Sequence, residues 1–175
     1  MVETVIRTFF EYFSVLMLAL GLVVAIANFS LSHRARAGGF AEQLFRWVAF
    51  FGAGITGVYC FMGHIFAPAT AAAQIGWETS PFQYEVGMAD LTVGVLCLLA
   101  FRRDFGFRLA ATIAAVIWYG GDAIGHIRQI VTAGNYSPGN AGPWLWSDLL
   151  LPVVLVSSLA LASRRRGELD RVSAG

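Results

Sequence analysis

An aspartate and a histidine stand one helical turn apart in an otherwise apolar stretch of the sequence. Asp122 and His126 are separated by four positions, so a helix would present both side chains on one face. A carboxylate and an imidazole on successive turns can both bind one metal ion, or the carboxylate can orient the imidazole. Tyr119 lies about one turn before Asp122 on the same helix. This pair is therefore the first candidate for chemistry.

Two ionisable residues stand at matching depths in neighbouring apolar segments. With a rise of about 1.5 Å per residue, Glu85 and His64 fall about as deep in their predicted helices as His126 does in its own. We predict that Asp122 and Glu85 are catalytic carboxylates and that a divalent metal ion binds to His126, Asp122, Glu85 and His64. A mixed imidazole and carboxylate set suits zinc, iron or manganese.

Asp90 and Asp148 fall in the same half of the predicted bundle, and their membership of the site stays open. Asp90 is five residues from Glu85, which turns the two side chains about 140° apart on a helix. We therefore do not expect them to bind the same ion. Gly87 and Gly94 flank Asp90 on its own face, which predicts close helix packing and a hydrogen bond from Asp90 to a neighbour.

The composition indicates a membrane protein. Hydrophobic residues make up 57% of the 175 residues, charged residues make up 13%, and the mean hydropathy is +0.65. A soluble domain of this size carries about 25% charged residues. The shortfall fits a chain whose surface faces a lipid bilayer. Cys60 and Cys97 lie far apart in apolar segments, which indicates neither a disulfide framework nor a CxxC motif.

Five apolar segments are long enough to cross a bilayer as helices, for which about 20 residues suffice. They run from about Phe9 to Ser32, Leu44 to Phe66, Ser80 to Phe101, Phe107 to Val131 and Pro143 to Ala162. We predict an all-α transmembrane bundle that forms one domain over residues 1–166, with a short polar cytoplasmic tail at 167–175. Ser80, Pro81 and Gln83 predict the N-cap and first turn of the third helix.

The arginines predict how the bundle is oriented. The chain has no lysine, and positively charged residues gather on the cytoplasmic side of membrane proteins. Most arginines flank the first and third predicted loops or follow the last span, so we expect the N-terminus outside and the C-terminus inside. These residues are Arg34, Arg36, Arg46, Arg102, Arg103, Arg108, Arg164, Arg165, Arg166 and Arg171. Topology explains the basic runs, so we expect no nucleic-acid partner.

The outer half of the predicted bundle carries a surplus of negative charge. Its positive residues are Arg7 and Arg128, and its acidic residues are Glu3, Glu11, Glu78, Glu85, Asp90, Asp122 and Asp148. An ionised group within a bilayer is costly unless it is paired. Protons, a bound metal or a cationic ligand must therefore relieve the surplus.

Glycines and turn-forming residues occur in and next to the parts of the sequence that form the outer half of the predicted bundle. Gly121 and Gly125 form a GxxxG pair beside the face of Asp122, which predicts close helix packing inside the bundle or in a homodimer. The segment GNYSPGNAGPWLW (134–146) is rich in turn residues and would fold back as a lid. Asn135 and Asn140 would then be polar groups that support the site.

Three segments carry a resemblance to other sequences: SPFQYEVGMADL (80–91), IWYGGDAIGHIRQ (117–129) and GNYSPGNAGPWLW (134–146). They resemble an uncharacterised family of small bacterial multi-pass membrane proteins. The overall build is similar to that of DoxX-like membrane proteins in size and helix count. The resemblance implies a location in the bacterial inner membrane and carries no catalytic assignment.

Four hypotheses follow for function. The first is a metal-binding intramembrane enzyme or redox accessory. The second is a proton-coupled carrier of a small or cationic solute, in which Asp122 or Asp90 titrates and which would need a dimer. The third is a non-catalytic subunit of a larger membrane complex. The fourth is a haem protein in which His64 and His126 bind the iron.

Overall fold

The computed structural model describes residues 8–173, except the side chains of residues 166, 168–170, 172 and 173. Over these residues every regular element is a helix, and five helices are long and apolar enough to cross a membrane. They are Phe13–Leu31, Phe40–Phe66, Phe82–Ala100, Phe105–Ala133 and Pro138–Arg165. The predicted all-α bundle of five spans is confirmed. The predicted charges Glu3 and Arg7 lie outside the described residues.

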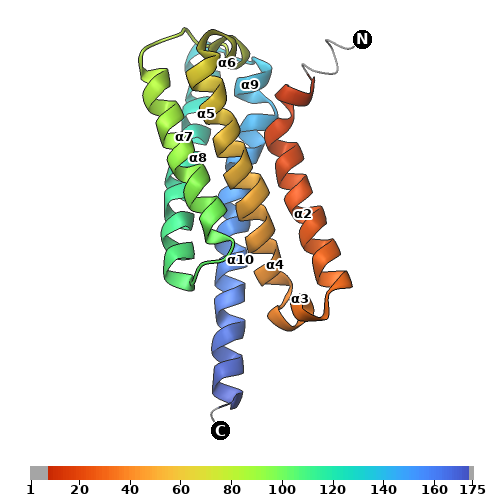
Figure 1. Cartoon of the computed structure of the whole chain (residues 1–175). Helices are drawn as coiled ribbons and strands as arrows, with labels where there is room; N and C mark the ends of the chain where they lie inside the picture. The colour runs from red at the N-terminus through yellow and green to blue at the C-terminus, as the bar shows by residue number, and fades with distance from the viewer. Residues whose placement is uncertain (1–7, 174–175) are drawn as a thin grey trace.

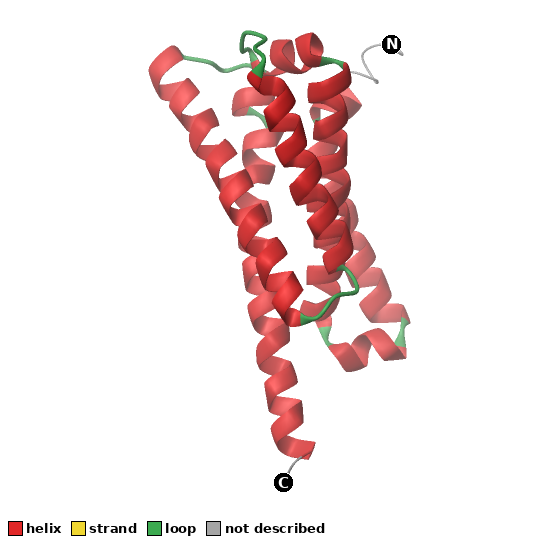
Figure 2. Ribbon diagram, turned by 60° about the vertical axis from the view of Figure 1, so that its left-hand side comes forward, coloured by secondary structure: helices red, strands yellow, loops and turns green. Residues whose placement is uncertain are grey.

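The five spans lie side by side in one elongated bundle (Figures 1 and 2). The first is α2 (Phe13–Leu31), and the second is built from α4 (Phe40–Trp47), a π-helix η1 (Val48–Ile55) and α5 (Thr56–Phe66). The third is α7 (Phe82–Ala100), the fourth is α8 (Phe105–Ala133), and the fifth lies in α10 (Pro143–Ser173). Phe45, Val48 and Leu155 form part of the buried core where the second span packs against α10.

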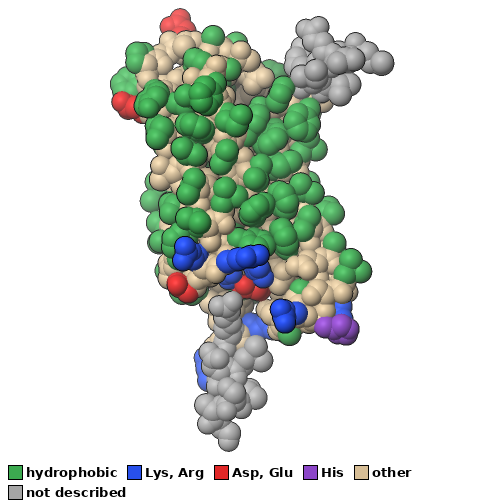
Figure 3. Space-filling view, viewed as in Figure 1, with side chains coloured by type: hydrophobic (Ala, Val, Ile, Leu, Met, Phe, Trp, Pro, Cys, Tyr) green, Lys and Arg blue, Asp and Glu red, His purple; other side chains and the backbone are tan. Residues whose placement is uncertain are grey.

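The short helices mark the two ends of the bundle. At one end, α6 (Pro68–Ile75) packs against α9 (Pro138–Ala141), and we call this the α6–α9 end. At the other end lie α3 (His33–Gly38) and the turn between α7 and α8, which carries Arg102 and Arg103. We call this the arginine end. Figure 3 shows apolar side chains over most of the length of one face and arginines gathered at the lower end.

The third span begins differently from the prediction. The helix α7 starts at Phe82, Pro81 is its N-cap residue, and no side chain caps it, so the predicted N-cap at Ser80 is wrong. The backbone carbonyl of Ser80 accepts from the Gln83 amide at 3.1 Å instead, and the Pro81 carbonyl accepts from Tyr84 at 3.2 Å. Because Pro81 already holds a helical backbone, the first turn forms without the Ser80 hydroxyl.

Side-chain capping does fix the start of the fourth span. The carboxylate of Asp104 accepts a hydrogen bond from the Phe107 amide at 3.0 Å, which satisfies a free amide of the first turn of α8. That hydrogen bond lowers the pKa of Asp104. The helix ends at Gly134, which adopts a left-handed backbone with φ of 61°, as the glycine after the predicted span suggests.

The fifth helix continues through most of the predicted tail. We expected the last span to end near Ala162, but α10 runs on to Ser173. Arg164 and Arg165 are exposed on this extension, which projects beyond the other helices (Figure 1). Arginine has a good helix propensity, so the basic run extends the helix and does not end it.

Glycines bring the second and third spans into close contact. A Cβ atom added at Gly57 would lie 2.7 Å from the Asp90 carbonyl oxygen, and one added at Gly94 would lie 3.0 Å from the Gly54 carbonyl oxygen. The close packing predicted beside Asp90 is therefore confirmed. By contrast, apart from the neighbouring backbone of α8 itself, no described atom lies within 4 Å of a Cβ built at Gly121 or Gly125. A homodimer through that GxxxG pair stays a prediction.

A carbonyl group of the π-helix accepts a hydrogen bond from another span. A π-helix has wider turns than an α-helix and occurs often at functional sites. In η1, the carbonyl of Ala53 accepts a hydrogen bond from the buried hydroxyl of Tyr119 at 3.1 Å. This bond links the second span to α8, which also carries Asp122 and His126.

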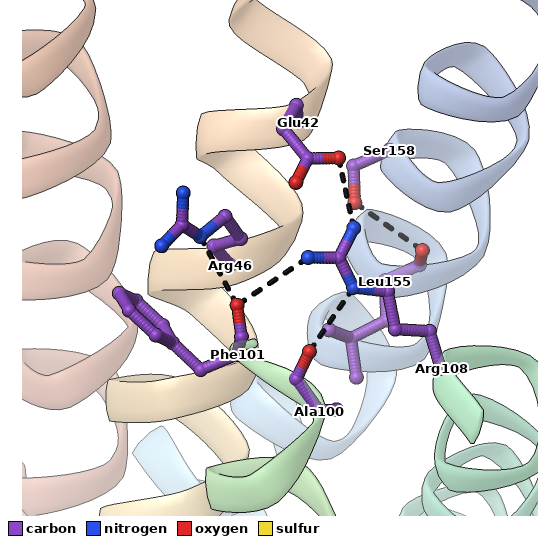
Figure 4. Close-up of polar contacts among 7 residues, drawn as sticks. All are labelled: Glu42, Arg46, Ala100, Phe101, Arg108, Leu155 and Ser158. Carbon is purple, nitrogen blue, oxygen red and sulfur yellow. Dashed lines mark hydrogen bonds and ion pairs between the residues drawn. The ribbon is translucent and has the colours of Figure 1, made fainter. Parts of the chain in front are cut away.

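A buried ion pair joins three spans at the arginine end (Figure 4). The Arg108 guanidinium on α8 donates to the Glu42 carboxylate on α4 at 2.8 Å, and Arg108 is only 4% exposed. Arg108 also donates to the carbonyls of Ala100 at 3.0 Å and Phe101 at 3.3 Å, where α7 ends. Arg46 donates to the same Phe101 carbonyl at 3.1 Å. Arg108 is therefore an interior group, although its position in the sequence suggested only a topological charge.

Replacing Arg108 should destabilise the bundle strongly. Arg108→Gln removes the positive charge beside the buried Glu42 carboxylate, and breaking such a pair costs about 3–5 kcal/mol. We expect equilibrium unfolding in detergent micelles to show a loss of about 3 kcal/mol. Arg103→Gln is the matched control, because Arg103 is exposed in the neighbouring turn and should change stability by less than about 0.5 kcal/mol. Equal effects of the two substitutions would contradict a stabilising role for the ion pair.

Candidate functional site

Two histidine–aspartate pairs lie in the half of the bundle toward the α6–α9 end. One joins His64 on α5 to Asp90 on α7, and the other joins His126 on α8 to Asp148 on α10. Four different helices thus contribute one ionisable side chain each. Asp90 is 5% exposed and Asp148 is 6% exposed, so both carboxyl groups are shielded from solvent and lipid.

Asn140 on α9 fixes the orientation of the His126 ring. The Asn140 side chain is fully buried, and its amide nitrogen donates to the backbone carbonyls of His126 at 3.2 Å and Asn135 at 2.9 Å. The amide oxygen therefore faces the His126 ring, where Nδ1 lies 2.9 Å away. An amide oxygen only accepts hydrogen bonds, so Nδ1 of His126 carries a proton and donates it.

This tautomer determines what His126 presents to Asp148. With the proton on Nδ1, the other ring nitrogen of a neutral histidine carries a lone pair. That atom, Nε2, lies 3.6 Å from Oδ2 of Asp148. A lone pair and a carboxylate oxygen that face each other need a cation between them. The His126–Asp148 pair is therefore built to share one positive charge, as a proton or as a metal ion.

The His64–Asp90 pair has a different arrangement. Oδ1 of Asp90 accepts a hydrogen bond from the Trp118 indole at 2.8 Å, and Oδ2 lies 4.0 Å from Nε2 of His64. The bond from Trp118 confirms the hydrogen bond that the sequence predicted for Asp90. Nδ1 of His64 is buried and has no hydrogen-bond partner among the described residues.

Asp122 belongs to neither of the two pairs. It is half-buried on α8, one turn before His126, and within the described part of the chain its carboxyl group has no hydrogen bond or ion pair. It lies within electrostatic range of both Asp90 and Asp148. Three carboxyl groups from three helices thus influence one another in a poorly solvated region. Such a group of like charges favours the uptake of a cation.

The four residues of the predicted metal site do not all lie together. His126 and Asp122 share a face of α8 as predicted, whereas Glu85 is exposed on α7 and His64 faces Asp90. Among the residues that the structure describes, no group of three or more histidine, cysteine, aspartate or glutamate side chains is arranged to hold a metal ion. Catalytic roles for Asp122 and Glu85 stay predictions.

The loop after α8 folds back over this half of the bundle. Asn135 donates to the Ile75 carbonyl at 2.9 Å, and a Cβ added at Gly139 would lie 2.6 Å from the Gln74 carbonyl oxygen, so α9 is held tightly against α6. The Trp77 ring lies 5.9 Å from the ring of His126. These contacts confirm that the segment folds back as predicted, and Asn140 binds His126 directly. The supporting roles of Asn135 and Asn140 in a functional site stay predictions.

A pocket of about 380 Å³ opens beside His64 at the same end of the molecule. Its walls come from the end of α5, the start of α6 and the start of α7 together with the residues before it. The lining residues are His64, Ile65, Pro68, Thr79, Ser80, Pro81, Gln83 and Tyr84. His64 therefore lines a surface pocket and also belongs to the His64–Asp90 pair.

The fold and the site together define a five-span helical membrane protein with paired histidines and aspartates in one half of its bundle. The chain belongs to a family of unknown function, DUF6790, whose sequence model matches residues 11–168. The matched range contains both pairs, Asp122, Asn140 and the Glu42–Arg108 ion pair. No curated protein matches the chain, and no solved structure matches it. This finding is consistent with the resemblance of the sequence to an uncharacterised family.

Proposed function

We propose that the protein is a proton-coupled carrier of a small cationic solute, and that protons and solute compete for the cluster formed by Asp90, Asp122, Asp148 and the two paired histidines. The single observation that carries the proposal is the geometry of His126 and Asp148. Asn140 directs the lone pair of Nε2 toward the Asp148 carboxylate, so this pair has a place for one exchangeable cation.

The surroundings of the His126–Asp148 pair support an exchangeable cation, because no fixed positive side chain in the described part of the chain neutralises the carboxylate permanently. No arginine lies against these carboxylates among the ion pairs of the described residues, whereas Arg108 neutralises Glu42 at the other end. Asp122 stands within electrostatic range of Asp148, and its carboxyl group has no hydrogen bond to any described residue. A proton or a cationic solute can therefore satisfy the cluster, and the binding of one disfavours the other.

A carrier that alternates between two states is open at one end and closed at the other, and the two ends of this bundle differ in that way. Toward the α6–α9 end, the pocket beside His64 gives access to one histidine–aspartate pair. At the arginine end, the buried Glu42–Arg108 ion pair and the carbonyls of Ala100 and Phe101 hold α4, α7 and α8 together. A carrier would have to break these contacts to open the second side.

The proposal includes a location and an orientation. Arg34, Arg102, Arg103 and Arg165 lie at or beyond the arginine end, which supports placing that end on the cytoplasmic side and the N-terminus outside. The resemblance to small bacterial membrane proteins supports the bacterial inner membrane. A homodimer would supply the size that five spans lack, and the open space beside Gly121 and Gly125 offers a face for it.

Transport by reconstituted protein tests the proposal. Proteoliposomes with an imposed pH gradient are supplied with radiolabelled small organic cations, including choline, ethanolamine and putrescine. We expect uptake of at least one of these cations to follow the gradient, and Asp148→Asn and Asp122→Asn each to lower the rate at least about tenfold by removing an exchangeable negative charge.

The matched control for this experiment is Glu78→Gln. It makes the same change from carboxylate to amide at the same end of the bundle, but Glu78 is exposed in the segment before α7. We expect its transport rate to equal that of the unmodified protein. Uptake that is independent of the pH gradient, or equal in Asp148→Asn, would contradict the proposal, as would the absence of uptake of every cation tested.

A metal-binding enzyme or redox accessory is the second candidate, and one observation favours it. A histidine that binds a metal through one ring nitrogen usually donates from the other to a fixed acceptor, as His126 does to Asn140. Zinc, iron or manganese could then bind Nε2 of His126 and Asp148, with Asp122 one turn away.

Metal analysis separates the second candidate from the first. Protein purified without chelators should contain about one zinc, iron or manganese ion per chain if the metal site exists, and His126→Ala should remove it because the imidazole lone pair that Asn140 orients is lost. Elemental analysis by mass spectrometry measures both samples. A metal content near zero in the unmodified protein, or an equal content in His126→Ala, would exclude this candidate.

A further inference from the structure

An apolar groove lies between α8 and α10 on the surface of the bundle. Its volume is about 390 Å³, and its lining runs from Phe105 and Ser163 at the arginine end to Ile117 and Val156. Leu159 is only 5% exposed and forms part of the floor, whereas Ile117 is 70% exposed on a wall. The groove is therefore open to the lipid that surrounds a membrane-spanning bundle.

The length of the groove matches one leaflet of a bilayer. From Phe105, the first residue of α8, to Ile117 the helix rises about 18 Å at about 1.5 Å per residue. The hydrocarbon core of a bilayer is about 30 Å thick, so the acyl chains of one leaflet cover about half of that distance. A transmembrane helix of a partner crosses both leaflets, whereas this groove ends near the middle of α8. The length therefore favours an acyl chain as the occupant.

Positive charge gathers where the groove reaches the arginine end. Arg164 directly follows Ser163 on one wall, and Arg103 stands two positions before Phe105 on the other wall. Both arginines are exposed. Asp104 stands between Arg103 and Phe105, but its carboxylate already caps α8 and lies within electrostatic range of Arg103. Positive charge thus predominates at this end of the groove and complements an anionic head group.

The positions of two successive arginines on α10 differ in a way that a test can use. Arg164 stands one helical turn after Ala160, which lines the groove, so it continues the same face of α10. Arg165 lies on another face, because its guanidinium donates to the Ala37 carbonyl of α3 at 3.5 Å. The two residues carry equal charge, but Arg164 alone of the two continues the face that lines the groove.

We infer that this groove binds one anionic phospholipid, whose acyl chain lies between α8 and α10 and whose phosphate lies at the arginine end beside Arg164. A zwitterionic phospholipid with the same acyl chains brings no net negative charge to this end and binds more weakly. The groove contains none of the paired histidines and aspartates, so the inference does not rest on the proposed transport.

Native mass spectrometry of the full chain in detergent tests the inference with two lipids of equal chain length. The protein is titrated with dioleoylphosphatidylglycerol and with dioleoylphosphatidylcholine, and the dissociation constant of the first bound lipid is measured. We expect the anionic lipid to bind at least about fivefold more tightly, which is the factor that one arginine near a membrane surface contributes. Arg164→Gln should remove most of this preference, whereas the matched control Arg165→Gln should retain it.

A groove-filling substitution tests the position of the acyl chain. Ala160 is an exposed lining residue, so Ala160→Trp fills the groove without entering the core, and we expect it to lose the first lipid at concentrations that saturate the unmodified protein. Ala27→Trp is the matched control, because Ala27 is exposed on α2 and does not line the groove. Its lipid binding should equal that of the unmodified protein. If Ala160→Trp does not fold, the two lipids and the two arginine variants decide the test.

Several results would overturn the inference: equal binding of the two lipids, equal effects of Arg164→Gln and Arg165→Gln, undiminished binding in folded Ala160→Trp, or no lipid retained by the unmodified protein. The same spectra also report the oligomeric state. A dimer that Ala160→Trp dissociates and Ala27→Trp does not would assign the groove to a second copy of the chain and overturn the lipid site.

Discussion

The constraint on which this structure depends is the scarcity of water between the ends of the bundle. A polar group within a bilayer must find its partner inside the protein, since lipid tails offer none. Asn140 shows the consequence most clearly, because this fully buried side chain satisfies the carbonyls of His126 and Asn135 together with the His126 ring. The buried hydroxyl of Tyr119 likewise finds its partner inside the protein, because it donates to the Ala53 carbonyl of the π-helix.

The two ends of the bundle solve this problem in opposite ways. At the arginine end, one guanidinium meets a carboxylate and two backbone carbonyls, so charge and hydrogen bonds balance inside the protein. Toward the α6–α9 end, several polar groups lack such a balance within the described residues. His126 and Asp148 need a shared cation, Asp122 has no hydrogen bond among the described residues, and His64 keeps an unpartnered ring nitrogen. The balanced contacts at the first end stabilise the bundle, and the proposed binding of a cation belongs to the second.

The sequence predicted the helices well because long apolar runs and the glycines and prolines after them determine where membrane helices begin and end. It predicted the site less well. Depth in the membrane can be counted along the chain, whereas the direction in which a side chain points depends on how the helices pack. Glu85 was chosen by depth and proved exposed, while Asp90 proved buried. The glycines flanking Asp90 were the better guide, since small residues mark the face where helices meet.

Other parts of the structure had no local signal in the sequence. Glu42 and Arg108 are separated by 66 positions, and nothing near either residue indicates the other. Asp148 stood near the start of its span and could equally have faced solvent, but the structure buries it, and α9, which belongs to the lid segment 134–146, packs against α10. Asn140 was predicted as a supporting group, yet only the fold shows that it selects the tautomer of His126.

The tautomer of His126 is the most direct test of this account. Nitrogen NMR of protein labelled with ¹⁵N-histidine, with His126→Gln used to assign the signal, reports the protonation of each ring nitrogen across a pH titration. We expect Nδ1 of His126 to stay protonated throughout while Nε2 alone changes, and Asp148→Asn to shift that change to a different pH. A neutral ring with its proton on Nε2 and a lone pair on Nδ1 would contradict the orientation by Asn140 and, with it, the shared cation at Asp148.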